Sequence, residues 1–144
     1  MPTDLRNRST QVKEARSKVI QDLTKFVGYR CEVSKLYGNT DLHEFWCTSK
    51  EVYSDKVALV LLTHPSNIIV VNHDLHINRK PSFETCLAAI RNRPVEVWKH
   101  FGFIDYYHSM IDFMNKIRGF YETGQIKVPV SYIPIAYVPK GNLI

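Results

Sequence analysis

Residues 56–73, KVALVLLTHPSNIIVVNH, decide the fold that this sequence predicts. Two apolar runs rich in β-branched residues, 56–63 and 68–73, flank an HPSN turn, which is the pattern of a β-hairpin. Residues 29–36 alternate polar and apolar side chains, and residues 42–48 can return beside them after the turn YGNTD. Together these segments predict a four-stranded antiparallel meander.

Helical patterns lie on both sides of these strands. Apolar residues recur at helical spacing over residues 10–27, where Thr10 can cap the first turn and Gly28 suits the position after the last. This amphipathic segment carries Lys and Arg on its polar face. Three further helices are predicted at residues 83–91 after Ser82, 94–101 before Gly102, and 105–123 before Gly124.

The strands are grouped in the sequence rather than alternating with helices, which indicates an α+β fold. We expect one domain over residues 1–144, an antiparallel β-sheet of about four to five strands with helices packed on one side. Residues 1–9 are predicted as a flexible basic arm, and the proline-rich residues 126–144 as an edge strand or arm. The expected core consists of Val19, Leu23, Phe26, Val57, Leu59, Leu61, Ile69, Val71, Leu87, Ile90, Met110, Ile111, Met114 and Ile117.

Basic residues outnumber acidic ones, with 19 Lys and Arg against 14 Asp and Glu and a net charge of +5. This balance favours polyanionic partners. The three cysteines form no CxxC pair, so neither a disulfide framework nor a cysteine zinc site is expected. A reducing compartment fits best: the cytoplasm, or a host's cytoplasm or nucleus for a viral protein. The apolar runs are too short to cross a bilayer, so no membrane partner is expected.

The sequence contains no recognisable catalytic or phosphate-loop motif, and it places basic residues close to aromatic ones. We therefore predict a small non-enzymatic binding protein with nucleic acid as its ligand, in which cations hold phosphates and rings stack on bases. Small basic domains of this kind are common among viral and phage accessory proteins. The predicted contacts are Lys13, Arg16, Arg79, Lys80, Arg91, Arg93, Trp98, Lys99 and Phe101.

One alternative is protein binding or assembly, as an inhibitor of a host factor or a subunit of a larger particle. The contact, with another protein or with a second copy, would be the helix 10–27 or the segment 126–138.

A third hypothesis is a metal-dependent nuclease built on His73, Asp74 and His76, which follow an apolar strand and precede basic residues. Against it, the two histidines would point to opposite faces of a strand, and a solvated strand end explains them better. A zinc site that adds His64 and Cys86 is disfavoured, because the predicted hairpin places His64 at its far end. No metal or other cofactor is expected.

Overall fold

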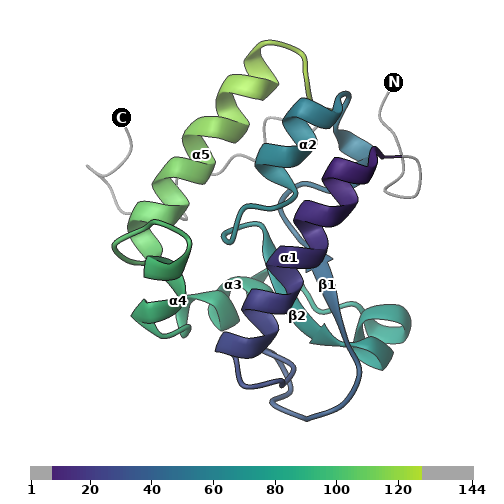
Figure 1. Cartoon of the computed structure of the whole chain (residues 1–144), viewed down its shortest axis with the longest axis vertical. Helices are drawn as coiled ribbons and strands as arrows, with labels where there is room; N and C mark the ends of the chain where they lie inside the picture. The colour runs from purple at the N-terminus through teal and green to yellow at the C-terminus, as the bar shows by residue number, and fades with distance from the viewer. Residues whose placement is uncertain (1–7, 128–144) are drawn as a thin grey trace.

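The computed structural model describes residues 8–127, and Figure 1 shows helices arranged around a short antiparallel sheet. The predicted α+β class and N-terminal helix are confirmed. In chain order, the elements are α1 (Thr10–Phe26), β1 (Thr40–Glu44), η2 (Ser49–Glu51), α2 (Asp55–Leu61), β2 (Ile68–Asn72), η3 (Leu75–Arg79), α3 (Phe83–Arg91), α4 (Val95–His100) and α5 (Tyr106–Glu122). The turn η2 is a 3₁₀ helix and η3 is a π-helix. No helix within residues 8–127 is long and apolar enough to span a membrane.

The sheet of the described chain has two strands, β1 and β2, which pair antiparallel along their whole length. It is smaller than predicted, and β1 covers only the start of the predicted strand 42–48. Ile68 and Val70 of β2 pack against α1 and α4, whereas Ile69 and Val71 point the other way into the larger core with α2, α3 and α5. Helices therefore cover both faces of β2, not one face as predicted.

Most of the predicted strand 56–63 lies in the helix α2 (Asp55–Leu61), so the predicted hairpin is wrong. Ser54 caps this helix, because its Oγ accepts a hydrogen bond from the backbone N–H of Val57 at 3.3 Å, and Asp55 places a negative charge in the first turn. Three residues at helical spacing are buried, namely Val57, Ala58 and Leu61. A short apolar run fits a buried strand and a buried helix equally well, and in this segment the Ser54 cap favours the helix.

Residues 29–36 form a turn instead of the predicted strand. The Cys31 N–H donates to the Leu36 carbonyl at 3.0 Å, and the Lys35 N–H donates back to the Cys31 carbonyl at 2.9 Å. Tyr29 and Lys35 have φ of 60° and 64°, which interrupt the extended backbone that a strand needs. The alternation of side chains in this segment therefore reflects a tight loop rather than a sheet.

The four predicted helices 10–27, 83–91, 94–101 and 105–123 are confirmed as α1, α3, α4 and α5. Ser9, rather than Thr10, caps α1, and its Oγ accepts from the Val12 N–H at 3.3 Å. Ser82 caps α3 in the same way. The glycines after three of these helices have positive φ, which ends each helix: Gly28, Gly102 and Gly124.

Of the predicted loose arm over residues 1–9, only Arg8 and Ser9 lie within the described residues, and Arg8 is not loose. Its side chain is buried and donates hydrogen bonds to the carbonyls of Ser49 and Val52 and to the carboxylate of Asp55. The start of the described chain is thus fixed to the N-terminus of α2. At the other end, Ile126 is buried and pairs with Val52, and residues 128–138 of the predicted segment 126–138 lie outside the described residues.

The core contains most of the residues expected there. Buried as predicted are Leu23, Val57, Leu61, Ile69, Val71, Leu87, Ile90, Met110, Met114 and Ile117. Val19, Leu59 and Ile111 are partly buried, and Phe26 is exposed beside His100. Two large buried rings, Trp46 and Phe113, were not predicted to be there.

Candidate functional site

A groove runs between α1 and β1 and continues to the turn η3. Two hollows make it up, one of about 450 Å³ and one of about 420 Å³, and they share Arg16, Leu42 and His76. We call it the α1–β1 groove. Its charged and titratable lining consists of Lys13, Arg16, Asp41, His43, Glu44, Lys50, His76 and Lys80.

Helical and strand periodicity place these side chains. On α1, Lys13, Arg16 and Ile20 lie three or four positions apart and therefore share one face. On β1, Leu42 packs in the small core cluster with α1, and Glu44 forms an ion pair with Arg16 at 3.1 Å. Alternation along the strand turns Asp41 and His43 to the other side, toward η3.

The π-helical turn η3 changes the direction of the histidines that the sequence singled out. His73 and His76 converge on one atom, Oδ2 of Asp41, which lies 2.7 Å from the Nδ1 of His73 and 3.0 Å from the Nδ1 of His76. Asp74 does not join them, because its carboxylate accepts a hydrogen bond from Asn78. The prediction that the two histidines point to opposite faces is therefore wrong.

Burial and the two histidines act in opposite directions on Asp41. Burial raises the pKa of this carboxyl group, but the hydrogen bonds to His76 and His73 outweigh it, so the pKa lies below its usual value. Asp41 is consequently an anion at neutral pH. It fixes the orientation of the His76 ring, as carboxylates commonly do for functional imidazoles.

His43 lies beside His76, with ring centroids 5.2 Å apart in an edge-to-face arrangement. Burial, together with the nearby charges of His76 and Lys80, lowers the pKa of His43 to about 4. His43 is therefore neutral at pH 7, whereas the carboxylate of Asp41 is charged. Groups whose pKa values are shifted in this way gather at functional sites more often than elsewhere.

Arg16 and Glu44 form the part of the groove that is most enclosed. Burial raises the pKa of Glu44 although the Arg16 guanidinium opposes this, and its Oε1 accepts the Ser49 N–H at 3.0 Å. The Nε of Arg16 is buried without a hydrogen-bond partner among residues 8–127. Arg16 thus carries one buried donor without a partner in this part of the chain.

Lys80 enters the groove from a strained backbone position. It ends η3 with φ 35° and ψ 108°, and its N–H donates to the Leu75 carbonyl at 2.7 Å. Both π-helical turns and strained non-glycine residues are enriched at functional sites. The unusual backbone around His76 and Lys80 therefore lies in the same part of the groove as Asp41 and His43, whose pKa values are shifted.

The structure does not bring metal ligands together. No group of three or more His, Cys, Asp and Glu side chains within residues 8–127 is arranged to hold a metal ion. His64 lies elsewhere, with its Nε2 on Asp112 at 2.9 Å, and burial raises the pKa of Cys86 to about 12. The zinc set of His64, His73, His76 and Cys86 is therefore not assembled.

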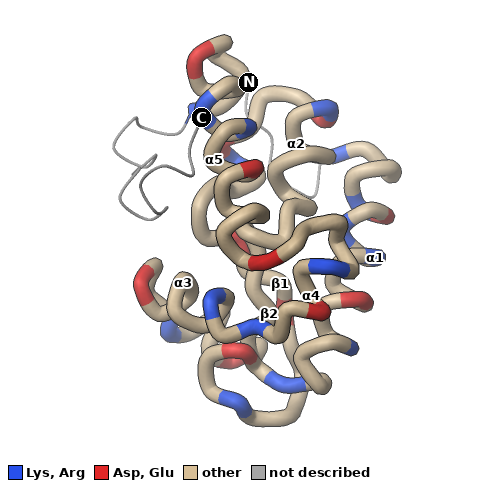
Figure 2. The backbone as a smooth tube through the Cα atoms, turned by 90° about the vertical axis from the view of Figure 1, so that its left-hand side faces the viewer, with Lys and Arg blue, Asp and Glu red and all other residues tan. Residues whose placement is uncertain are grey.

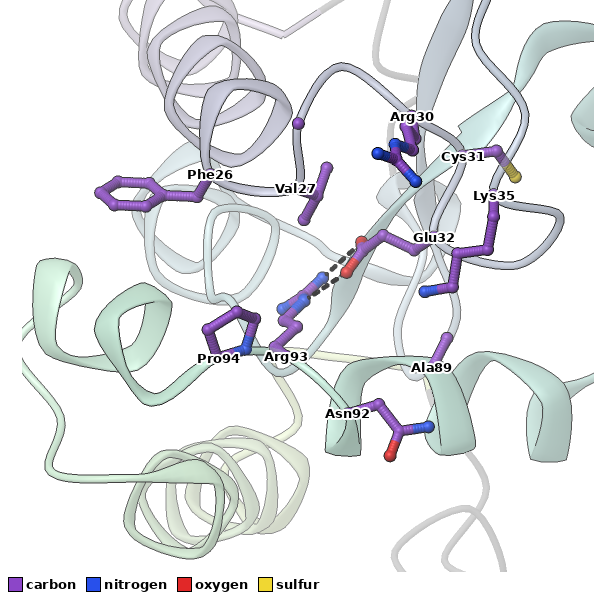
Figure 3. Close-up of a pocket in the computed structure, with 11 residues that line it drawn as sticks. Phe26, Val27, Arg30, Cys31, Glu32, Lys35, Ala89, Asn92, Arg93 and Pro94 are labelled. Carbon is purple, nitrogen blue, oxygen red and sulfur yellow. Dashed lines mark hydrogen bonds and ion pairs between the residues drawn. The ribbon is translucent and has the colours of Figure 1, made fainter.

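Two of the predicted nucleic-acid contacts, Arg93 and Trp98, lie in the interior of the protein. Arg93 is buried and holds Glu32 with two hydrogen bonds of 2.6 and 2.8 Å, the pair that Figure 3 shows between the α3–α4 turn and the loop after α1. Trp98 is 1% exposed and lies under the Arg93 guanidinium at 5.3 Å. Both side chains are enclosed, which does not agree with the predicted phosphate contact and base stacking.

The other predicted contacts lie at or near the surface. Arg91, Lys99 and Arg79 are exposed, and Phe101 is partly buried against the small core cluster. None of the four lines the α1–β1 groove. Of the predicted nucleic-acid contacts, the groove thus unites Lys13, Arg16 and Lys80.

Asp41, His43 and Lys50 belong to the site but were not predicted. Asp41 and His43 reach it through the β1–β2 register, which pairs Asp41 with Val71 and His43 with Ile69. In the sequence, the only sign of these residues was the dipeptide His43–Glu44. Without the β1–β2 register, the side chains that surround this dipeptide in space could not be known.

Comparisons of the chain with models of protein families, with curated proteins and with solved structures found no match.

Proposed function

We propose that this protein binds nucleic acid in the α1–β1 groove, through contacts between its cations and successive phosphates. The observation that carries this proposal is the convergence of basic side chains from three separate segments, α1, the η2 turn and the end of η3. The four cations are Lys13, Arg16, Lys50 and Lys80. Figure 2 shows that acidic residues are interspersed with basic ones along the rest of the chain, so a local concentration is informative.

Both acidic residues of the groove already have partners, and only Glu44 takes its partner, Arg16, from these four cations. Asp41 accepts from two histidines, and Glu44 is paired with Arg16 and the Ser49 N–H. Among residues 8–127, no ion-pair partner lies within reach of Lys13, Lys50 or Lys80. Free cations around a groove are the electrostatic footprint of a polyanion site, and the net charge of +5 acts in the same direction.

The salt dependence of binding tests this proposal. If each of the four cations neutralises one phosphate of a single strand, the slope of log K against log salt is about −2.8. The variant Lys13→Gln/Lys80→Gln removes two contacts and should bring the slope to about −1.4. Fluorescence anisotropy with labelled RNA and DNA oligonucleotides at 50 to 200 mM salt measures both slopes.

A matched control removes two cations from outside the groove. Lys56 on α2 and Lys99 on α4 are exposed and line neither hollow. The variant Lys56→Gln/Lys99→Gln has the same net charge as the groove variant, and it should keep the steeper slope. Equal weakening by the two variants would reject the groove as the site, and no binding at 50 mM salt would reject the function.

A second candidate function, protein binding, is favoured by one surface. Tyr29, Leu36 and Tyr37 in the loop after α1 are 61%, 63% and 67% exposed, and large apolar side chains that cluster at a surface are typical of protein contacts. This loop, and not the apolar face of α1, which packs on β2, is the available contact. Sedimentation velocity tests for self-association, which Leu36→Ser/Tyr37→Ser should reduce.

A further inference from the structure

Two histidines stand side by side in the α1–β1 groove, a feature that phosphate binding alone does not require. His43 on β1 and His76 on η3 both line the hollow of about 420 Å³, with ring centroids 5.2 Å apart. Arg16 and Lys80 line the same hollow. The place where a phosphate would be held is therefore also the place where two imidazoles meet.

Three ring nitrogens of these two histidines have no hydrogen-bond partner among residues 8–127 and are available for proton transfer. The Nδ1 of His76 is occupied by Asp41, which leaves Nε2 on the opposite side of the ring. Within the described chain, neither this Nε2 nor the nitrogens of His43 take part in a hydrogen bond. One imidazole is thus held by a carboxylate and the other is free, which is the arrangement that general acid–base catalysis uses.

We propose that His43 and His76 cleave RNA bound in this groove by general acid–base catalysis without a metal ion. The proposal rests on the proposed function, since the groove must first hold the RNA backbone. It extends that function by naming RNA as the ligand and by adding a reaction. The nucleophile is the ribose 2′-hydroxyl of the RNA itself, so the protein supplies only proton transfer and charge stabilisation.

The step balances with the groups present. His43 takes the proton of the 2′-hydroxyl as its oxygen forms a bond to the adjacent phosphorus. The bond from phosphorus to the 5′-oxygen breaks, and His76, in its charged form, gives that oxygen a proton. The products are a 2′,3′-cyclic phosphate end and a 5′-hydroxyl end. One histidine has gained a proton and the other has lost one, and exchange with water restores both.

The surroundings of the two rings assign these roles. Burial lowers the pKa of His43 to about 4, with help from His76 and Lys80, so this ring is a neutral base at pH 5 to 7. Asp41 positions the other ring. Arg16 and Lys80 line the same hollow, and their positive charges would stabilise the negative charge that develops on the phosphorane oxygens. Glu44 and Lys50 are the remaining charged groups of this hollow.

The experiment uses the full chain and an end-labelled DNA oligonucleotide that contains one ribonucleotide. Cleavage is expected next to the ribonucleotide, in EDTA, with a cyclic phosphate on the 5′ fragment, and the all-DNA oligonucleotide should stay intact. His43→Gln and His76→Gln should each slow cleavage by about 100-fold or more, the usual contribution of a general acid or base. Glutamine keeps the side chain polar, and thermal unfolding of each variant checks that it folds.

The control variant is His108→Gln, which changes a half-exposed histidine at the start of α5 that pairs with Asp105. It should cleave at the wild-type rate. RNA binding without cleavage, or binding of DNA but not of RNA, would overturn this inference and leave the proposed function standing, whereas no binding of either nucleic acid would overturn both. Equal cleavage by the wild type and His43→Gln from parallel purifications would also overturn the inference, as would cleavage that stops in EDTA.

Discussion

The guanidinium of Arg93 shows how single residues organise this protein. It holds both carboxylate oxygens of Glu32, and it also donates to the carbonyls of Pro65 and Ile68 at 2.7 Å each. Glu32 in turn accepts the N–H of Val70 at 2.7 Å. One ion pair thus connects the loop after α1, strand β2 and the α3–α4 turn.

Because this pair is buried, removing one partner should cost more than the pair itself contributes. Arg93→Ala leaves the Glu32 carboxylate without its cation, and we expect a loss of about 3–5 kcal/mol in the free energy of unfolding. Urea denaturation measures it. The neighbouring exposed residue provides the control, since Arg91→Ala should change stability by about 0.5 kcal/mol or less. A loss below about 1 kcal/mol for Arg93→Ala would contradict the structural role given to this pair.

His64 is a second residue whose protonation state is fixed by its contacts. Its Nδ1 accepts the Ser66 N–H at 3.2 Å, so the ring proton sits on Nε2, which donates to Asp112 at 2.9 Å. Burial lowers the pKa of His64, although Asp112 acts in the opposite direction. A second proton would have to displace the Ser66 hydrogen bond.

The pH dependence of stability follows from these lowered pKa values. The unfolded chain binds the proton of His64 and of His43 more readily than the folded chain does. The stability that these two histidines contribute is therefore fully present above their ordinary pKa of 6.5. It is lost as the pH falls below 6.5, and for His43 the loss continues down to about pH 4. Each histidine contributes at most about 1.4 kcal/mol per pH unit. The carboxyl of Asp112, with its pKa lowered to about 2, affects stability only below 3.8.

Urea midpoints measured between pH 7.5 and pH 4.5 should fall for the wild type and fall less for His64→Gln. The matched variant His108→Gln should show the wild-type slope, because that ring is half-exposed. Parallel pH profiles for the wild type and His64→Gln would show that His64 does not contribute to this dependence.

Among the elements, α2 depends on a single cap. Without the hydrogen bond from the Val57 N–H to Ser54, the short helix Asp55–Leu61 loses the partner of its first turn. Ser54→Ala should therefore destabilise the protein by about 1 kcal/mol in urea denaturation. Ser17→Ala, on an exposed position within α1, should leave stability unchanged or slightly higher. An unchanged midpoint for Ser54→Ala would argue against the cap.

The elements that could be predicted from the sequence are those with a signal at each end. α1, α3 and α5 each have a serine or aspartate before them, and α1 and α5 are followed by glycine, so local chemistry sets their bounds. The segment 56–63 carries an apolar run on which strand and helix patterns overlap, and the prediction of a strand did not consider Ser54, which caps the helix. At 29–36, left-handed backbone at Tyr29 and Lys35 has no signature in those residue types.

At the scale of the whole molecule, the groove exists because distant segments meet. Three elements supply most of its lining, and no local pattern in the sequence connects them. Helix α1 supplies Lys13 and Arg16, strand β1 supplies Asp41 and His43, and the turn η3 supplies His76. Charge alone singled out Lys13, Arg16 and Lys80 in the sequence, and all three line the groove. Asp41 and His43 could not, because a strand's neighbours depend on a register that the predicted four-stranded sheet did not contain. Arg93 and Trp98 show the converse, since charge and aromatic character do not reveal burial.

The location of the ligand tests the central claim most directly. Two-dimensional ¹H–¹⁵N NMR of the labelled chain, titrated with a short single-stranded RNA at low salt and kept intact by 2′-O-methyl groups, maps the contact surface residue by residue. We predict that shift changes concentrate on α1 around Lys13 and Arg16, on β1 at His43, and on the end of η3 at Lys80. Shift changes confined to Arg91 and Lys99 on α3 and α4, or no change at all, would contradict binding in the α1–β1 groove.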